Sequence, residues 1–148
     1  MEYQGCYIDG FRTGHGKCFF EENKNLRFEG IFKNDLPVEG ILYHENGVKR
    51  CEGKFKNGQM DGAGITVWYD SGVLKYEGSM KSGASHGPGS WYFENGNMKF
   101  EGNFQDDMPH GNDVKIYTGE GSLEYKGSLN KGQRQGWGVL YYFNNNKS

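Results

Sequence analysis

The glycines of this chain recur with a period of 23 to 25 residues, and this period constrains the fold more than any other feature. An apolar residue, a variable residue and a glycine begin each repeat, at positions 3, 28, 51, 76, 100 and 125. We call these repeats units 1 to 6 and number each from its first residue, which has offset 0. Glycine occupies offset 2 in all six units, and most other glycines lie at offsets 7, 11 and 13. Such self-similarity is typical of repeat architectures. The units predict a single array over residues 1–148, with a short Asn-rich tail at 144–148.

The hydrophobic pattern within each unit predicts a β-hairpin. Apolar residues lie at offsets 0 and 4 and often at offset −2, whereas offsets 1 and 5 are mostly polar. This alternation is typical of a strand with one buried face. The glycine at offset 2 falls on that face, where it leaves room for a neighbouring ring. We expect offsets 6 to 13 to form a loop, followed by a second strand and a turn such as Glu-Asn-Gly. The predicted fold class is all-β, with twelve strands in one antiparallel sheet of tandem hairpins.

Composition and charge exclude several classes of protein. The formal net charge is −2 with both signs interspersed, so no basic face for nucleic acid is expected. No apolar run approaches the ~20 residues of a membrane span, and the N-terminal residues lack the apolar segment of a signal peptide. Cys6, Cys18 and Cys51 have no Cys-x-x-Cys spacing, which indicates reduced thiols and a cytoplasmic location. A Cys6–Cys18 bridge across a hairpin is the alternative.

The phased pattern resembles the MORN repeat (membrane occupation and recognition nexus). The copy YEGSMKSGASHGPG, which begins at Tyr76, fits the motif well, and the resemblance covers roughly residues 3–143. The linker Glu94–Gly102 is similar to a longer variant of the repeat. Departures are local: unit 2 lacks one residue near Pro37–Gly40, Cys51 replaces an aromatic residue, and Asp113 replaces a glycine.

The resemblance implies one elongated, twisted antiparallel sheet and a non-catalytic role. Members of the family bind other proteins, associate with themselves, or are proposed to bind phospholipid head groups. It therefore implies a scaffold or protein-interaction module within a larger cytoskeletal, ciliary or membrane-associated assembly. A phospholipid-binding module, or a regulatory array beside a separate enzyme, is the alternative.

The second strands are apolar on both faces, and this suggests a binding surface. Counting unit 2 as one residue shorter, we expect offsets 14 and 16 on one face and offsets 15 and 17 on the other. A large exposed apolar patch is typical of interaction sites, although rings that pack on one another are the plainer interpretation. We expect an aromatic stripe to receive a helix, an extended segment or a second copy, and replacing both Trp68 and Trp91 by alanine to abolish that binding. The candidate partner-binding residues are Phe20, His44, Trp68, Trp91, Phe93, Tyr117 and Tyr142.

Two further surfaces affect which kind of partner is expected. Lys or Arg at offset −1 and Glu at offset 1 form mixed rows on the first strands, which are typical of a solvated face. Because the Glu row would cancel the positive charge, this pattern argues against the lipid alternative. The edges of the open sheet could also be extended by a partner or a second copy.

Catalysis has little support in the sequence. The stretch SGASHGPGS at Ser82–Ser90 is glycine-rich like a phosphate loop, but it lacks the Lys-Ser/Thr ending and no helix follows. His15, His86 and His110 lie at differing offsets in the expected loops, where a structural role is the simpler interpretation. No metal-ligand spacing occurs. We expect no enzyme activity, no cofactor and no metal.

Overall fold

Each unit contains a two-residue β-turn that reverses the chain. The residues at offsets 6 and 7 both have positive φ, as in Asn57 (51°) and Gly58 (78°). This is the geometry of a type I′ turn, whose twist matches that of the flanking strands. Glycine adopts it without strain, while Asp35 and Asp107 occupy offset 7 in units 2 and 5 with φ of 71° and 67°. The two strands of each unit therefore pair directly beside the turn.

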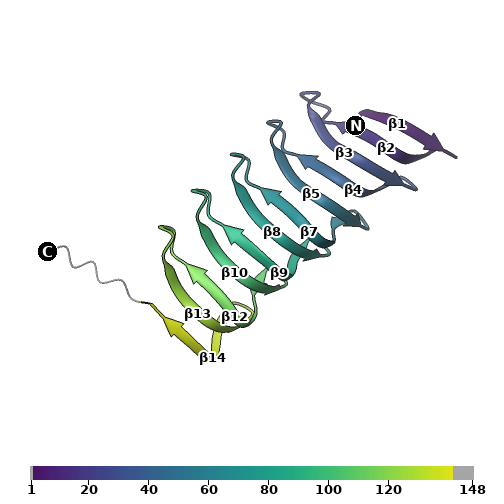
Figure 1. Cartoon of the computed structure of the whole chain (residues 1–148). Coiled ribbons are helices and arrows are strands. Elements are labelled where there is room, and N and C mark those ends of the chain that lie inside the picture. The colour runs from purple at the N-terminus through teal and green to yellow at the C-terminus, as the bar shows by residue number, and fades with distance from the viewer. Residues whose placement is uncertain (1, 142–148) are drawn as a thin grey trace.

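The computed structural model describes residues 2–141, which form one open antiparallel sheet (Figure 1). Twelve strands follow one another in chain order, while β6 pairs only with β5 and β11 only with β10. The all-β prediction of tandem hairpins is confirmed. Residues 2–141 contain no helix that is long and apolar enough to cross a membrane. The strands are β1 (Glu2–Ile8), β2 (Phe11–Phe19), β3 (Leu26–Lys33), β4 (Leu36–Tyr43), β5 (Lys49–Lys56), β6 (Gln59–Met60), β7 (Gly62–Trp68), β8 (Leu74–Lys81), β9 (Ala84–Tyr92), β10 (Met98–Gln105), β11 (Met108–Pro109), β12 (Gly111–Tyr117), β13 (Leu123–Asn130) and β14 (Gln133–Leu140).

The prediction of a loop at offsets 6 to 13 is wrong. Only the two turn residues leave the sheet in units 1, 2, 4 and 6, so β9 already begins at Ala84 and includes most of the stretch Ser82–Ser90. The glycines at offsets 11 and 13 lie within or beside strands, at positions where the pairing register shifts. In units 3 and 5 such a shift divides the second strand into two pieces, which are β6 with β7 and β11 with β12.

A row of glycines crosses the sheet and makes room for aromatic rings. Neighbours in this row pair across strands, as Gly78 does with Gly89. The ring of Tyr76 lies over both glycines, and a Cβ on either would overlap it. Its hydroxyl donates a 2.6 Å hydrogen bond to the carbonyl oxygen of Ser79. The sequence prediction that offset 2 leaves space for a ring is confirmed here. Tyr3, Phe28 and Tyr125 lie over the glycines of their own units in the same way.

Units 3 and 5 fill this space differently. Ile65 and Val114 occupy the row where units 1, 4 and 6 have the glycine at offset 13, and both side chains are fully buried. The Ile65 side chain lies where a Cβ on Gly53 would be. Because Cys51 supplies no ring in unit 3, Ile65 fills the volume that a ring occupies elsewhere. The apolar face is thus continuous despite the missing aromatic residue.

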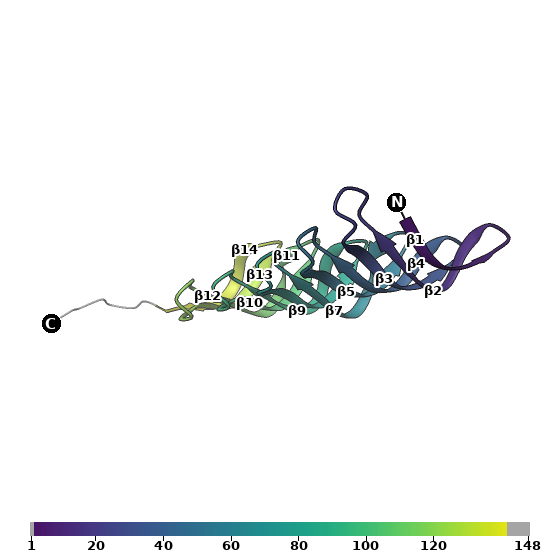
Figure 2. The ribbon, with the colours of Figure 1, turned by 90° about the horizontal axis from the view of Figure 1, so that it is seen from above.

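The two faces of the sheet differ in character. One face, which we call the inner face, carries a row of cross-strand neighbours that contains Tyr3, Cys18, Phe28, Leu42, Cys51, Val67, Tyr76, Trp91, Phe100, Ile116, Tyr125 and Leu140. A second inner row contains Tyr7, Phe32, Phe55, Met80, Phe104 and Leu129. Nine of the twelve described buried hydrophobic residues belong to these rows, and the other three are Met60, Ile65 and Val114. The strands bow along their length, and the array is long and narrow when seen from above (Figures 1 and 2).

Hydrogen bonds between successive turns fix the spacing of the units. At one margin of the sheet, Asn46 donates from Nδ2 to the carbonyl oxygen of Asp70 at 2.8 Å, and Asn95 donates to that of Gly119 at 2.6 Å. At the other margin, the backbone N–H of Asp107 donates to the Ser85 carbonyl oxygen at 3.0 Å. These bonds tie each hairpin to the next and hold the inner face as one surface.

Candidate functional site

A β-bulge at each joint between units redirects one side chain. Leu42 pairs with Cys51 and the next residue, Tyr43, pairs with Lys49, so Arg50 is the extra residue of a bulge. Two residues then oppose one on the partner strand, and alternation between the faces is interrupted. The same shift occurs at Arg27, Lys75, Lys99 and Glu124. Four basic residues at offset −1 are thereby displaced from the alternation that the sequence predicts.

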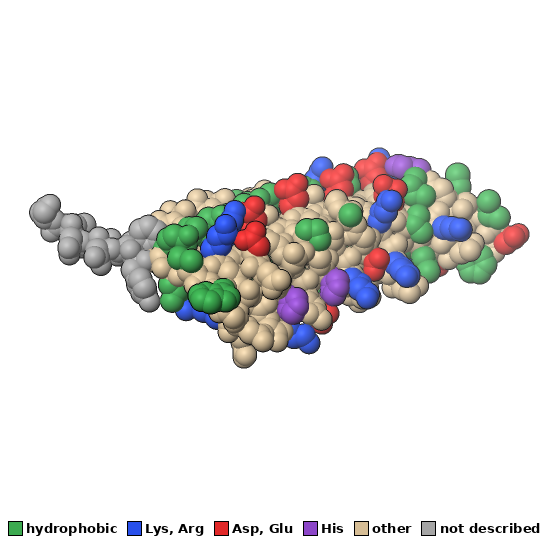
Figure 3. Space-filling model, turned by 60° about the horizontal axis from the view of Figure 1, so that its bottom comes forward, with side chains coloured by type: hydrophobic (Ala, Val, Ile, Leu, Met, Phe, Trp, Pro, Cys, Tyr) green, Lys and Arg blue, Asp and Glu red, His purple; other side chains and the backbone are tan. Residues whose placement is uncertain are grey.

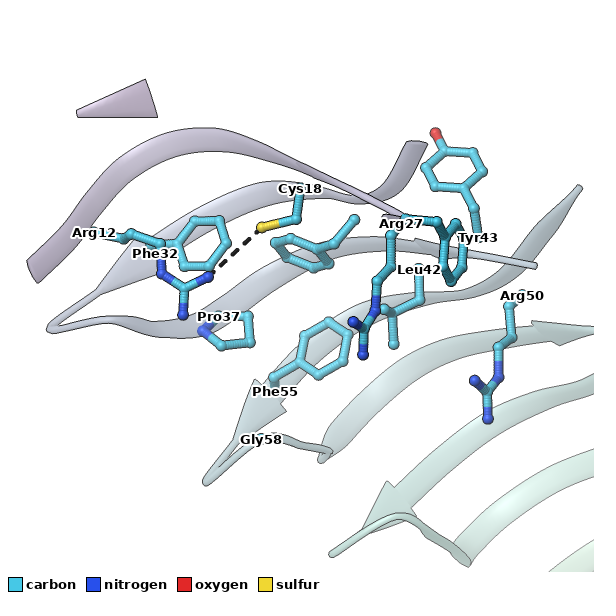
Figure 4. A pocket seen from close by; sticks show the side chains of 12 residues that line it. Arg12, Cys18, Arg27, Phe32, Pro37, Leu42, Tyr43, Arg50, Phe55 and Gly58 are labelled. Atoms are coloured by element: carbon cyan, nitrogen blue, oxygen red, sulfur yellow. Dashed lines mark hydrogen bonds between the residues drawn. The ribbon is translucent and has the colours of Figure 1, made fainter. Parts of the chain in front are cut away.

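Two of these side chains line a hollow on the inner face. The hollow has a volume of about 350 Å³ and is lined by the Arg12, Arg27 and Arg50 side chains above apolar groups. Its apolar lining includes Cys18, Phe28, Phe32, Leu42 and Phe55. Figure 4 shows the arginine side chains around this apolar floor. Positive charge and apolar surface therefore occur together in one recess.

Arg12 is held in place by contacts on several sides. Its Nε donates to Asp35 Oδ1 at 2.7 Å, and its guanidinium lies 4.9 Å from the centroid of the Phe32 ring. The Arg12 guanidinium keeps the pKa of the Asp35 carboxyl below its usual value, and the pKa of Arg12 is raised in turn. This end of the hollow is thus preorganised, because the ion pair with Asp35 and the contact with the Phe32 ring hold the guanidinium in place.

The basic residues continue along the inner face into unit 4. The Lys75 Nζ lies 5.6 Å from the centroid of Trp91 and 5.4 Å from that of Tyr69. Lys75 and Trp91 line a second hollow of about 410 Å³ beside Tyr76. Farther on, the Lys99 Nζ lies 5.4 Å from the centroid of Phe100. Cations within ~6 Å of a ring centroid are attracted to the ring face, so the rings hold these charges near the apolar floor.

The acidic residues at offset 1 lie on the opposite, outer face. Glu29 is 3.7 Å from Lys17, Glu52 is 3.4 Å from Lys49, and Glu101 is 3.9 Å from Lys115. The expectation that the basic residues at offset −1 share a face with this Glu row is therefore wrong. The bulge is the reason, because it separates the two rows onto different faces. The Glu row does not cancel the positive charge in the inner hollows.

The predicted aromatic stripe does not form one row. Trp91 belongs to the inner row, whereas Trp68 and Tyr117 pair with Leu74 and Leu123 on the outer face. The remaining described candidates, Phe20, His44 and Phe93, follow β2, β4 and β9 and begin the turns that lead to the next unit. Tyr142 lies outside the described residues. A role of any of the seven in binding stays a prediction.

A shift of one residue explains this dispersal. The inner row uses offset 15 in units 1, 4 and 6 but offset 16 in units 3 and 5, where an additional bulge precedes the second strand. Since side chains alternate with a period of two, one extra residue moves every later side chain to the other face. A set of residues chosen by equal offset, without allowance for these bulges, therefore contains residues from both faces.

Sequence reasoning missed the basic residues of the inner face. Strict alternation places offset −1 on the face opposite offset 0, so it predicts that Arg50 and Lys75 belong to a solvated row. The recurrence of Arg or Lys directly before the offset 0 residue was visible. No residue type in that segment marks a bulge, so the sequence alone did not place these charges beside the rings.

The groups that could bind a metal or act as nucleophiles are expected to be structural. No group of three or more His, Cys, Asp or Glu side chains in residues 2–141 is placed to hold a metal ion. Burial raises the pKa of the Cys51 thiol to about 11, which makes it a poor nucleophile. Cys6 pairs across the strands with Thr13, and Cys18 pairs with Tyr3, so the two thiols of the alternative bridge do not face each other.

Comparison with known proteins identifies the repeat. The family model described as MORN repeat matches residues 3–23, 51–73 and 125–147. The family model described as MORN repeat variant matches residues 85–106. No curated protein matches the chain.

Proposed function

The chain belongs to the MORN-repeat family, and we propose on that premise that it is a non-enzymatic protein-interaction module whose inner face receives a segment of a partner protein. MORN repeats occur in modules that bind proteins or lipids and are not typically enzymes. The observation that carries the proposal is the combination of basic side chains and apolar rings in the hollows of the inner face. We propose further that the chain is a structural subunit of a larger cytoplasmic assembly.

The chemistry of the inner face defines the partner segment. Arg50 and Lys75 are charged groups beside the apolar side chains of Leu42, Phe55 and Trp91. A helix or extended segment with apolar residues toward the floor and Asp or Glu toward Arg50 and Lys75 would satisfy both. Aromatic and arginine side chains in desolvated recesses are the groups that most often dominate protein–protein binding energy. The partner segment is therefore expected to be amphipathic and acidic.

A protein fits this surface better than a bilayer. Lys75 and Lys99 are drawn toward rings on the floor of the bowed sheet, as their distances to Trp91 and Phe100 show. The anionic surface potential of a planar membrane falls off within a Debye length, so it attracts most strongly the basic side chains that reach the membrane surface. The outer face carries the Glu row and is paired internally. An anionic membrane is accordingly the competing partner that the experiment must separate.

Matched charge reversals test the proposal. Arg50→Glu with Lys75→Glu changes the inner face, and Lys54→Glu with Lys126→Glu makes the same change in net charge on the outer face. Each variant and the parent chain are used for quantitative affinity purification from cells, and folding is checked by circular dichroism. Each is also mixed with vesicles of phosphatidylcholine alone or with phosphatidylserine.

The expected result is loss of specific protein partners with the inner pair and their retention with the outer pair. Binding of the parent chain to phosphatidylserine vesicles, with no protein lost by the inner pair, would overturn the proposal in favour of lipid binding. Equal loss with both pairs would show a non-specific effect of net charge and would also overturn it.

A further inference from the structure

Large exposed apolar side chains gather at the two ends of the array. Seven of the ten described examples lie in the outermost hairpins, namely Tyr7, Ile8, Phe11, Trp137, Val139, Leu140 and Tyr141. Figure 3 shows hydrophobic side chains at both ends of the molecule. Within residues 2–141, β1 pairs only with β2 and β14 only with β13. Sheet edges are usually protected by Lys, Pro or a covering segment, and the sequence of β14 contains neither Lys nor Pro.

We propose that β14 of one copy pairs with β1 of a second copy, so that copies of this chain associate head to tail. The strands alternate in direction along the sheet, so this pairing is antiparallel like every joint within the chain. The contact would reproduce the joint between β2 and β3, or that between β9 and β10. It concerns the sheet edges and does not depend on the function proposed for the inner face.

The register of this joint follows from the units inside the chain. Unit 6 has Gly136-Trp137-Gly138 where unit 1 has Gly14-His15-Gly16 and unit 4 has Gly87-Pro88-Gly89. In unit 4, Gly89 pairs with Gly102, and Trp91 pairs with Phe100. The equivalent pairs between two copies are Gly138 with Gly5 and Leu140 with Tyr3. Both glycine rows and both inner rows then continue across the joint without interruption.

The exposed edge residues would take the place of buried residues. Tyr7 is 58% exposed, whereas Phe32 and Phe104, which occupy the same offset in units 2 and 5, are each 3% exposed. Phe32 and Phe104 each have a neighbouring strand on that side, where Gly14 and Gly87 lie opposite the two rings, whereas no described strand precedes β1. Gly136 of a second copy would lie opposite Tyr7 in the same way. Trp137, which is 92% exposed, would lie opposite Cys6 of that copy.

Arg134 is already positioned for this joint. Its guanidinium lies 5.1 Å from the Tyr125 centroid, as that of Arg12 lies 5.6 Å from Tyr3. Arg12 also contacts Phe32 in the following unit. Arg134 has the same offset, so the ring that completes its surroundings would be Tyr7 of the second copy. The contact joins two different surfaces, and such a contact repeats along a chain of copies unless the rotation closes a ring.

A complementation experiment tests this arrangement. Tyr7→Ser weakens the β1 edge and Trp137→Glu weakens the β14 edge, while Met108→Glu alters an exposed apolar residue away from both. Sedimentation velocity is measured for each full-length chain alone and for the two edge variants mixed in equal amounts. We expect concentration-dependent oligomers beyond the dimer for the parent chain and Met108→Glu, monomers for each edge variant, and a one-to-one dimer for the mixture.

Other results would overturn the proposal. A parent chain that stays monomeric at all concentrations contradicts it directly. An edge variant that still dimerises alone shows that like edges pair with each other.

A disulfide test covers the case in which an edge variant fails to fold. Trp137→Cys places a thiol opposite the exposed Cys6 of the next copy, and oxidised glutathione supplies the oxidant. A ladder of dimers, trimers and higher species on non-reducing gels is expected, and Cys6→Ser in the same chain should abolish it. A dimer that persists with Cys6→Ser, or no cross-link at all, contradicts the pairing.

Discussion

The ring of Tyr76 lies over the Cα atom of Gly89 on the neighbouring strand, in the space that a Cβ would need. The backbone of Gly89 has no positive φ, so the glycine is required for space and not for conformation. This relationship explains why glycine recurs across the sheet. The glycines leave a row across the sheet without side chains, and aromatic rings occupy the space above that row.

Replacing Gly89 by alanine is expected to lower the free energy of unfolding by about 2–3 kcal/mol, since the methyl group overlaps a buried ring. Gly119→Ala is the matched control, because Gly119 also lacks positive φ and has nothing near its Cβ position. That variant should change stability by no more than about 0.5 kcal/mol. Urea unfolding of both variants measures the difference. Equal effects would show that the ring does not occupy this space.

Replacing Ile65 by alanine is expected to cost about 2–4 kcal/mol, because Ile65 is fully buried and fills the volume that a ring occupies in other units. Ile31→Ala is the control, since Ile31 is an exposed residue of the same type on the outer face. Chemical denaturation of both chains checks the prediction. A small loss for Ile65→Ala would mean that unit 3 does not depend on this side chain.

Stability should decline at alkaline pH in a way that depends on Tyr76. Burial raises the pKa of Tyr76 from 10.0 to about 12. Its stabilising contribution is therefore complete below pH 10 and is lost as the pH rises toward 12, because the unfolded chain ionises first. Tyr76→Phe should reduce the decline between pH 10 and 12. The effect should be partial, since burial also raises the pKa of Tyr3, Tyr69 and Tyr117.

Urea unfolding at a series of pH values measures this dependence. Near neutral pH the Tyr76→Phe variant should lose only about 1 kcal/mol, from the hydrogen bond to Ser79. An unchanged slope above pH 10 in the variant would contradict the role of Tyr76.

The three cysteines should react at very different rates. Cys6 is exposed, whereas Cys18 and Cys51 are buried, and burial raises the pKa of Cys51 to about 11. Iodoacetamide at neutral pH should alkylate Cys6 in the folded chain and leave the other two unmodified, because the thiolate is the reactive form. Peptide mass spectrometry reads each site. Full labelling in urea is the control, and rapid native labelling of Cys51 would contradict the packing around it.

The sequence predicts the hairpins and the apolar face because both depend on local periodicity. The glycines at offset 2, together with the alternation of apolar and polar residues that places Tyr76 and Met80 on one face, are sufficient to predict both. The assignment of faces on the second strands fails because bulges near Gly62 and Gly111 each shift the register by one residue. Glycine does not mark these bulges in the sequence, because Gly14 and Gly87 hold the same offset in units 1 and 4, where the pairing with the next unit has no such shift.

The same limit applies to the candidate site. The sequence pattern places Trp68 and Trp91 in one stripe, yet the two residues lie on opposite faces, so separate variants are needed to distinguish them. Salt dependence does not separate protein binding from lipid binding, because Arg50 and Lys75 would make binding of an acidic protein sensitive to ionic strength. The separation of protein from lipid rests on the vesicle experiment instead.

Site-specific photo-cross-linking tests the central claim, which is that a partner contacts the inner face. Benzoylphenylalanine replaces Phe100 on the inner face in one chain and Tyr92 on the outer face in another, since both are half-buried rings on adjoining strands. After irradiation in cells, mass spectrometry identifies the attached peptides. We predict cross-links from position 100 to acidic, amphipathic segments, and their loss when Arg50→Glu and Lys75→Glu are added. Cross-links that arise only from position 92, or that survive the charge reversal at position 100, would contradict the account.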